Sequence, residues 1–177
     1  MPKNLNLQLK DDSRRRLVTF NTVSLMFDGS LILKSILKNI KRKDTVFVVG
    51  CVAWLSNKRI LSALSKKQGV CFVCTKDKLL KRKSNRAAFK LLKPCFPDST
   101  PIRTVGAGRG RLKSLLHHKF IIGCSEDAKP LWVMNGSFNM TESAMTNIEN
   151  MMLFEDEEVA QAFYEEFCRV FKISKKC

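Results

Sequence analysis

The sequence of 177 residues is poor in acidic residues, in histidine and in long apolar runs. The chain has 16 acidic residues and 32 Lys and Arg residues, so its formal charge is +16. This excess of positive charge favours a polyanionic partner. Apolar runs such as residues 46–55 are far shorter than the roughly 20 residues of a membrane-spanning helix. Residues 1–16 are polar and charged, unlike a secretory signal. We therefore expect a cytoplasmic protein with no stable membrane association.

The positive charge is concentrated in the first two thirds of the chain. Residues 1–123 hold 27 basic and 6 acidic residues, whereas residues 124–177 hold 5 basic and 10 acidic residues. The densest basic stretch, residues 76–86, has six cations and one acid. A solvated loop or helix face explains one such stretch equally well. It does not explain the excess of positive charge over residues 1–123. These charges repel one another, so we expect a negatively charged partner that compensates them.

The seven cysteines do not indicate a disulfide framework. Their number is odd, and most lie in apolar runs where cysteine acts as a small hydrophobe, which favours a reducing compartment. Cys71 and Cys74 have the spacing of some zinc and redox sites. They fall in a strand-like run, where residues three apart point to opposite faces, so we expect no metal site there.

Hydrophobic periodicity predicts strands that alternate with helices. Helices are expected at residues 29–40, 56–67, 86–93 and 156–171, and strands at 17–23, 45–53, 69–75, 102–105, 115–122, 131–134 and 150–155. This alternation favours an α/β fold with a mixed, largely parallel central β-sheet flanked by helices on both faces.

No internal repeat is visible, so one domain is expected over residues 17–173. Residues 1–16 would form a basic N-terminal segment with little fixed structure, and residues 174–177 a tail.

Both histidines of the chain are adjacent, at His117 and His118. In a strand, His117 and Lys119 would share one face, whereas His118 would point the other way and pack in the core or against a helix. Ser137 and Asn139 would share a side if their backbone is extended. Together they would supply an imidazole, an ammonium, a hydroxyl and an amide, a set that suits a phosphoryl group.

The order of these residues resembles the signature of the phospholipase D superfamily. The likeness rests on His117-x-Lys119, on Gly136-Ser-Phe-Asn139 and on Asn147-Ile-Glu-Asn150, and it spans about residues 45–170. It is greatest toward the small nucleases of the superfamily that carry one motif per chain.

The resemblance implies a role for each residue of the motif. His117 would be the nucleophile that forms a phosphohistidine, and a second histidine would protonate the leaving oxygen. Lys119 and Asn139 would bind phosphate, and Ser137 would support their pocket. Glu149 would hold the far ring nitrogen of His117 and fix its tautomer. No metal or cofactor is expected, because Lys119 supplies the positive charge.

This chemistry needs two histidines at one phosphate, and one chain offers a single suitable one. We therefore predict a homodimer in which His117 of each copy contributes to one composite active site. The family motif places Asp where this chain has Cys124. In a regular strand that position faces away from His117, so its Asp is expected to be structural, but the loss leaves open a catalytically weak protein.

We expect a metal-independent endonuclease that cleaves DNA or RNA. Two alternatives remain: a phospholipid hydrolase of the cardiolipin type and a non-enzymatic nucleic-acid binder. Trp54 and Trp132 lie in apolar runs and are expected in the core, so base readout is not suggested. The residues expected to contact nucleic acid are Lys76, Lys78, Lys81, Arg82, Lys83, Arg86, Arg103, Arg109, Arg111 and Lys113.

Overall fold

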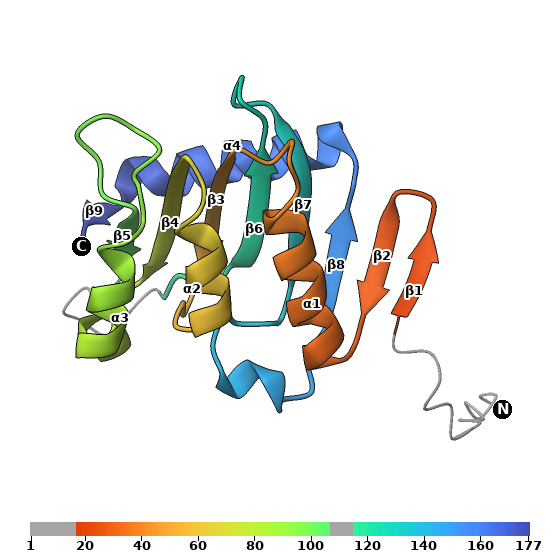
Figure 1. Cartoon of the computed structure of the whole chain (residues 1–177), viewed down its shortest axis with the longest axis horizontal. Helices are drawn as coiled ribbons and strands as arrows, with labels where there is room; N and C mark the ends of the chain where they lie inside the picture. Colours follow the sequence, from red (N-terminus) through yellow and green to blue (C-terminus); the bar gives the residue numbers. More distant parts are fainter. Residues whose placement is uncertain (1–16, 107–114) are drawn as a thin grey trace, which may run out of the picture.

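A nine-stranded sheet runs through this computed structural model, which describes residues 17–106 and 115–177 (Figure 1). The strand order is β1-β2-β8-β7-β6-β3-β4-β5-β9. The strands are β1 (Leu17–Phe20), β2 (Val23–Met26), β3 (Phe47–Val52), β4 (Gly69–Thr75), β5 (Ile102–Val105), β6 (Lys119–Cys124), β7 (Pro130–Gly136), β8 (Met151–Phe154) and β9 (Lys175–Lys176). The helices are α1 (Gly29–Ile40), α2 (Lys58–Leu64), α3 (Lys83–Phe89) and α4 (Glu157–Ile173), with 3-10 turns η1 (Lys78–Lys81) and η2 (Ser143–Met145).

The sheet is mixed, as expected, but it is mainly antiparallel, so the prediction of a largely parallel sheet is wrong. Among the described strands, only β3 with β4 and β4 with β5 pair in parallel, and the other six pairings are antiparallel. A helix between two strands returns the chain for a parallel pairing, and among the described strands that are neighbours in the sheet, only β3, β4 and β5 are joined in this way. Short connections such as Ser125–Lys129 reverse the chain and give antiparallel neighbours.

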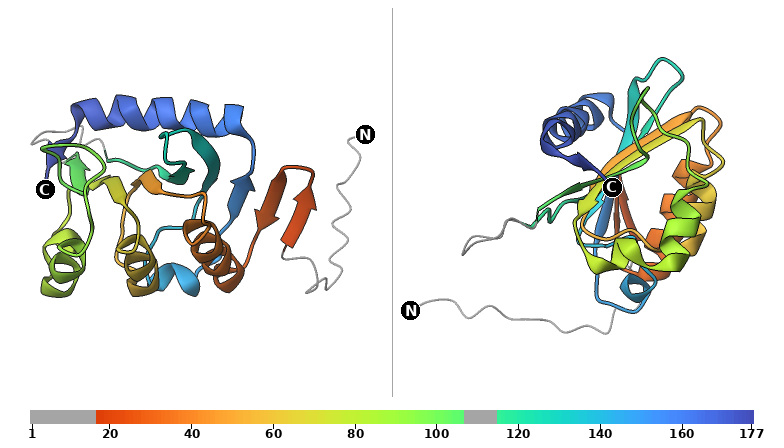
Figure 2. Two further views of the ribbon diagram at one scale, coloured as in Figure 1. Left: turned by 45° about the horizontal axis from the view of Figure 1, so that its top comes forward. Right: turned by 90° about the vertical axis from the view of Figure 1, so that its left-hand side faces the viewer.

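Helices cover both faces of the sheet, as expected (Figure 2). α1, α2 and α3 lie on one face, and α4 crosses the other. Ile36 of α1 and Val52 of β3 belong to the larger hydrophobic core, whereas Phe167 of α4 and Phe120 of β6 belong to the second. None of the helices that the structure describes is long and apolar enough to cross a membrane.

Two predictions near the chain ends need correction. The strand predicted at residues 17–23 is a hairpin of β1 and β2, because Asn21 takes a left-handed conformation (φ 45°) that turns the chain back. The predicted tail at residues 174–177 is part of the sheet: β9 pairs with β5, and Ser174 is buried. The predicted segment 1–16 lies outside the described residues.

Cys71 and Cys74 lie in different cores, on opposite faces of β4, as expected for residues three apart in a strand. Burial raises the pKa of both thiols, to about 12 for Cys71. Within the described part of the chain, no group of three or more His, Cys, Asp or Glu residues is placed to hold a metal ion.

Candidate active site

The predicted catalytic residues lie at one end of the strands, at the bottom of the sheet in Figure 1. We call this row of strand ends the lower edge of the sheet. At this edge β3, β4, β5 and β7 end, while β6 and β8 begin. Because β8, β7 and β6 are neighbours, the segments around Glu149, Ser137 and His117 lie side by side. The sheet topology therefore brings together three motifs that are separate in the sequence.

The backbone at the two histidines is held at three successive carbonyl oxygens, those of residues 116–118. Thr75 Oγ1 donates to the first at 2.7 Å, Lys119 Nζ to the second at 2.7 Å, and the Ala53 backbone N–H to the third at 3.0 Å. β6 begins only at Lys119, so the prediction of a strand from residue 115 is wrong. The donors lie in or next to β3, β4 and β6, so the histidines are anchored to the sheet.

The two histidine side chains have different surroundings. His118 Nε2 lies 2.9 Å from Glu166 Oε1 of α4, and its ring packs edge-on against Phe120 with 5.4 Å between centroids. His118 thus packs against a helix, as expected. His117 is exposed, and none of the described residues hydrogen-bonds to its ring. The His118 side chain is also partly exposed, but its ring is held by Glu166, so His117 is the imidazole left available to a substrate.

Lys119 is only 6% exposed, which is unusual for a lysine. Burial lowers the pKa of its ammonium, and the carboxylate of Glu149 opposes that shift by favouring the charged form. Its Nζ is oriented by the carbonyl oxygen of His117. The structure thus places a buried cation against the backbone of the residue that carries the exposed imidazole; His117 itself precedes the strand, so the predicted strand alternation does not set this arrangement.

Glu149 has different partners from those expected. Its carboxylate accepts hydrogen bonds from Ser137 Oγ and, at 3.3 Å, from Asn147 Nδ2. The expected bond to the His117 ring is absent from the described contacts of the chain. The reason is topological: β7 lies between β6 and β8, so the residue after β7 meets Glu149 first.

Gly136 allows this close contact between the segments after β7 and before β8. A Cβ atom at Gly136 would lie 2.2 Å from the carbonyl oxygen of Asn150. Directly beside it, the Ser137 N–H donates to that oxygen at 3.0 Å, and Ser137 Oγ accepts from the Asn150 N–H, also at 3.0 Å. Gly136 is therefore required sterically for Ser137 to reach Glu149.

Asn139 lies in a hollow of about 380 Å³ near the same edge. Its Oδ1 is buried and has no hydrogen-bond partner among the described residues. Trp54 forms another wall of the hollow, and its ring N–H donates to Asp77 at 2.9 Å. The prediction that Trp54 lies in the core is therefore wrong. The same prediction for Trp132 is confirmed, because Trp132 is fully buried. The remaining lining residues are Lys78, Arg82, Thr141, Ser143 and Asn147.

Two cations in the lining of this hollow suit an anionic ligand, and its one carboxylate, that of Asp77, is paired with Trp54. Lys78 and Arg82 are exposed cations at its wall, and Asn147 links it to Glu149 of the neighbouring cluster. Lys and Arg side chains are typical of phosphate binding, whereas the unpaired Asn139 Oδ1 is an acceptor and would pair with a donor group of a ligand or with water.

The other predicted cations divide into three groups. Arg103 is engaged inside the protein: it donates to Ser174 Oγ at 2.7 Å and to the Ser174 carbonyl oxygen at 2.8 Å, and its guanidinium lies 4.3 Å from the centre of the Phe171 ring. We therefore remove Arg103 from the set of expected nucleic-acid contacts. Arg109, Arg111 and Lys113 lie outside the described residues. The exposed group is Lys76, Lys78, Lys81, Arg82, Lys83 and Arg86.

Cys124, at the position of the motif Asp, is buried in the second core with Phe120 and Phe167. Ile121, of opposite parity, belongs to the larger core. Cys124 thus points toward α4, as its position in the strand predicts, and does not line the edge that carries Lys119.

Two contributors to the site were missed from the sequence. Thr75 carries a recognisable signal, a polar residue at the carboxyl end of an otherwise apolar strand. Glu166 carries none, because it is 48 residues from His118 and is one of many acids on the last helix.

Comparison with known proteins supports this description. A family model described as "Cardiolipin synthase, PLD-like domain" matches residues 36–171. Among curated proteins, uncharacterized protein L381 of Acanthamoeba polyphaga mimivirus is 24% identical over 208 aligned positions, which cover 97% of this chain and 72% of that protein.

Solved structures share the fold at low sequence identity. NucT from Helicobacter pylori matches with a TM-score of 0.68 and 15% identity, over 88% of this chain and 98% of its own. Nuc from Salmonella typhimurium, a phospholipase D family member, matches with a TM-score of 0.59 and 17% identity over the same shares. TrmBL2, an archaeal chromatin protein, has a TM-score of 0.54 and 15% identity, over 88% of this chain and 54% of that one. With a family model covering most of its length, the chain belongs to the phospholipase D superfamily.

Proposed function

We propose that this protein is a metal-independent phosphodiesterase that acts as an endonuclease on DNA or RNA. The observation that carries the proposal is the pairing of an exposed imidazole, His117, with a buried ammonium, Lys119, at one sheet edge. The exposed cations from Lys76 to Arg86 follow β4 along the same edge and suit a polyanionic backbone.

The reaction proceeds in two displacements at phosphorus. In the first, a ring nitrogen of His117 forms a bond to phosphorus while the bond to the leaving oxygen breaks, and a second imidazole donates a proton to that oxygen. In the second, water attacks phosphorus and gives a proton to the second imidazole, and the nitrogen–phosphorus bond breaks. The net result is hydrolysis of one phosphodiester with both imidazoles returned to their starting states.

Lys119 stabilises the charge that develops on the non-bridging oxygens. An ammonium that is largely removed from water interacts more strongly with a phosphoryl group than an exposed one. Its contact with the carbonyl oxygen of His117 fixes its position before substrate binds. In the proposed site Asn139 contributes its amide N–H groups to the same anion, and the hydrogen bond between Ser137 and Glu149 holds the segments after β7 and before β8 together.

The second imidazole must come from a second copy of the chain. His118 contacts Glu166 and turns toward α4, so one subunit offers only His117. A two-fold axis close to His117 would bring both copies of that ring to one phosphate, so the dimer is part of the proposed catalytic unit.

A second candidate function is hydrolysis of an anionic phospholipid. The name of the matching family model, which refers to cardiolipin synthase, favours it. A third candidate is a binder of nucleic acid without turnover, favoured by Cys124 at the motif Asp position and by the likeness to the chromatin protein TrmBL2. Both alternative functions would use the same positive surface, so the assay must compare nucleic acid with phospholipid as substrate.

We expect the protein to cut nucleic acid in the presence of EDTA. Labelled plasmid, single-stranded oligonucleotide and cardiolipin vesicles would be incubated separately, each with the wild type and with His117→Ala as the inactive control. Four phosphate contacts to duplex DNA would lower the binding constant about 10²-fold between 50 and 200 mM salt, and cleavage at limiting substrate should fall with it.

Three outcomes of this assay would contradict the proposal. Cleavage that requires added Mg²⁺ would refute the metal-independent mechanism. Turnover of vesicles with intact nucleic acid would assign the site to lipid, and binding of nucleic acid without any cleavage would leave only the third candidate.

A further inference from the structure

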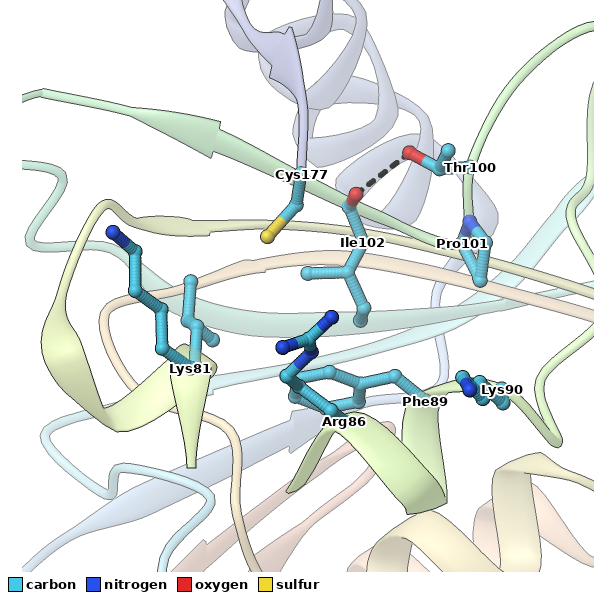
Figure 3. Close-up of a pocket in the computed structure, with 9 residues that line it drawn as sticks. Lys81, Arg86, Phe89, Lys90, Thr100, Pro101, Ile102 and Cys177 are labelled. Carbon is cyan, nitrogen blue, oxygen red and sulfur yellow. Dashed lines mark hydrogen bonds between the residues drawn. The ribbon is translucent and has the colours of Figure 1, made fainter. Parts of the chain in front are cut away.

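A larger hollow lies away from His117, between α3 and β5 (Figure 3). Its volume is about 640 Å³, within the range of small-molecule binding sites. Ile102 and Pro101 face Arg86 and Phe89 across it, and the thiol of Cys177 points into it. The remaining lining residues are Leu80, Lys81, Lys90 and Thr100.

The lining combines an apolar floor with a cationic rim. Leu80 and Ile102 are almost fully buried, and Phe89 packs partly against the larger core. The carbonyl oxygen of Ile102 accepts hydrogen bonds from Thr100 Oγ1 at 2.7 Å and from the Cys177 N–H at 3.3 Å. Because this oxygen is already paired, β5 would contact a ligand mainly through its side chains. No carboxylate side chain lines this hollow in the described part of the chain.

A third hollow of about 440 Å³ adjoins both this hollow and the hollow around Asn139. The third hollow shares Leu80, Lys81 and Cys177 with the first and Asp77 with the hollow around Asn139. It adds three more cations, Lys76, Lys175 and Lys176. The three hollows therefore adjoin one another around η1, from Asn139 to Phe89, with the Asp77 carboxylate at the junction nearest Asn139; we call this series of hollows the path.

We propose that the hollow between α3 and β5 binds an unpaired base of the nucleic-acid strand whose phosphate reacts at His117. This inference rests on the proposed function and adds a substrate class to it, a single strand or an unwound end. The base lies against Phe89 and Ile102, and the rim cations Lys81, Arg86 and Lys90 bind the flanking phosphates.

Two features favour an unpaired strand over other occupants. A duplex keeps its base faces inside the stack, so it has nothing to place on an apolar floor. A phospholipid carries its charge in one headgroup and would leave most of the cation-lined path empty. A strand has a phosphate at every nucleotide and fills the path from one hollow to the next.

The test is a binding measurement on protein that carries His117→Ala, so that the oligonucleotide stays intact. Fluorescence anisotropy would compare a labelled single strand with the same strand built with abasic sites. Phe89→Leu should weaken binding of the intact strand about tenfold, the scale of one stacked base, and should have little effect on the abasic strand. Arg86→Gln should weaken binding of both strands several-fold.

Lys38→Gln is the matched control, because Lys38 is an exposed cation on α1, outside this path. It should change affinity less than twofold. If Phe89→Leu does not fold, Arg86→Gln and the abasic strand still decide the question. Equal affinity of the intact and the abasic strand for the His117→Ala protein, with no change in the hollow, overturns the inference.

The remaining outcomes separate this inference from the proposed function. Unchanged affinity in both hollow variants, with normal cleavage by the wild type, overturns the inference alone. A wild type that neither binds nor cleaves any nucleic acid overturns both. Binding to cardiolipin vesicles that is lost in Phe89→Leu, while oligonucleotide affinity stays unchanged, replaces the base with a lipid.

Discussion

Replacing His117 with alanine is expected to abolish phosphodiester cleavage, with a rate loss of at least about 10³-fold. The substitution removes the nucleophile from one subunit and the proton donor from the other, and either loss alone blocks the reaction. His117 is exposed, and no described residue hydrogen-bonds to its ring, so the fold should be unaffected. Single-turnover cleavage of a labelled oligonucleotide in EDTA measures the effect.

The adjacent histidine supplies the matched control. His118→Ala removes a partly exposed contact with Glu166, which should cost at most about 1 kcal/mol of unfolding free energy. Its cleavage rate should stay within about tenfold of the wild type, because His118 is turned toward α4 and a tenfold change would need about 1.4 kcal/mol of activation free energy. The reverse pattern, an active His117→Ala with an inactive His118→Ala, would show that the roles have been assigned to the wrong residue.

Replacing Lys119 with glutamine is expected to lower kcat about 10²- to 10³-fold. The loss is that of one preorganised group that stabilises transition-state charge, so kcat should fall more than substrate affinity. Lys119→Arg should not restore the rate, because the planar guanidinium does not reproduce the compact ammonium held at the His117 carbonyl. A fall in substrate affinity with kcat unchanged would instead make Lys119 a simple binding cation.

The pH dependence gives an independent measure of the same residue. Burial lowers the pKa of Lys119, so activity should decline at alkaline pH before an ordinary lysine would lose its proton. Glu149 opposes this shift, so Glu149→Gln should lower the pKa of Lys119 further and move the alkaline decline to lower pH. A decline that stays in place or moves to higher pH would contradict the assigned coupling.

Local patterns in the sequence were sufficient to predict several elements with their observed bounds. The apolar spacing of residues 29–40 gives α1, and Asp28 caps it by accepting from the backbone N–H groups of Ser30 and Leu31. The apolar run from Gly69 to Thr75 gives β4, which is buried throughout. In these segments local signals, the burial pattern and the helix cap, select the structure.

Long-range arrangement was predicted less well, because it depends on which strands become neighbours. His118 packs against a helix as predicted, although it precedes β6 and does not lie in a strand. Nothing in the sequence indicated that β7 lies between β6 and β8. The partner of Glu149 was therefore predicted wrongly: it is Ser137 and not His117. Trp54 was misplaced for a similar reason, since its partner Asp77 follows a different strand.

The most direct test of the composite site is the activity of mixed dimers. Wild-type and His117→Ala subunits would be mixed in varied ratios, allowed to exchange, and assayed at constant total protein. If one site needs the ring of both copies, activity follows the square of the wild-type fraction, and an equal mixture keeps about one quarter of full activity. Activity proportional to the wild-type fraction, about one half in the equal mixture, would show that each chain is complete by itself.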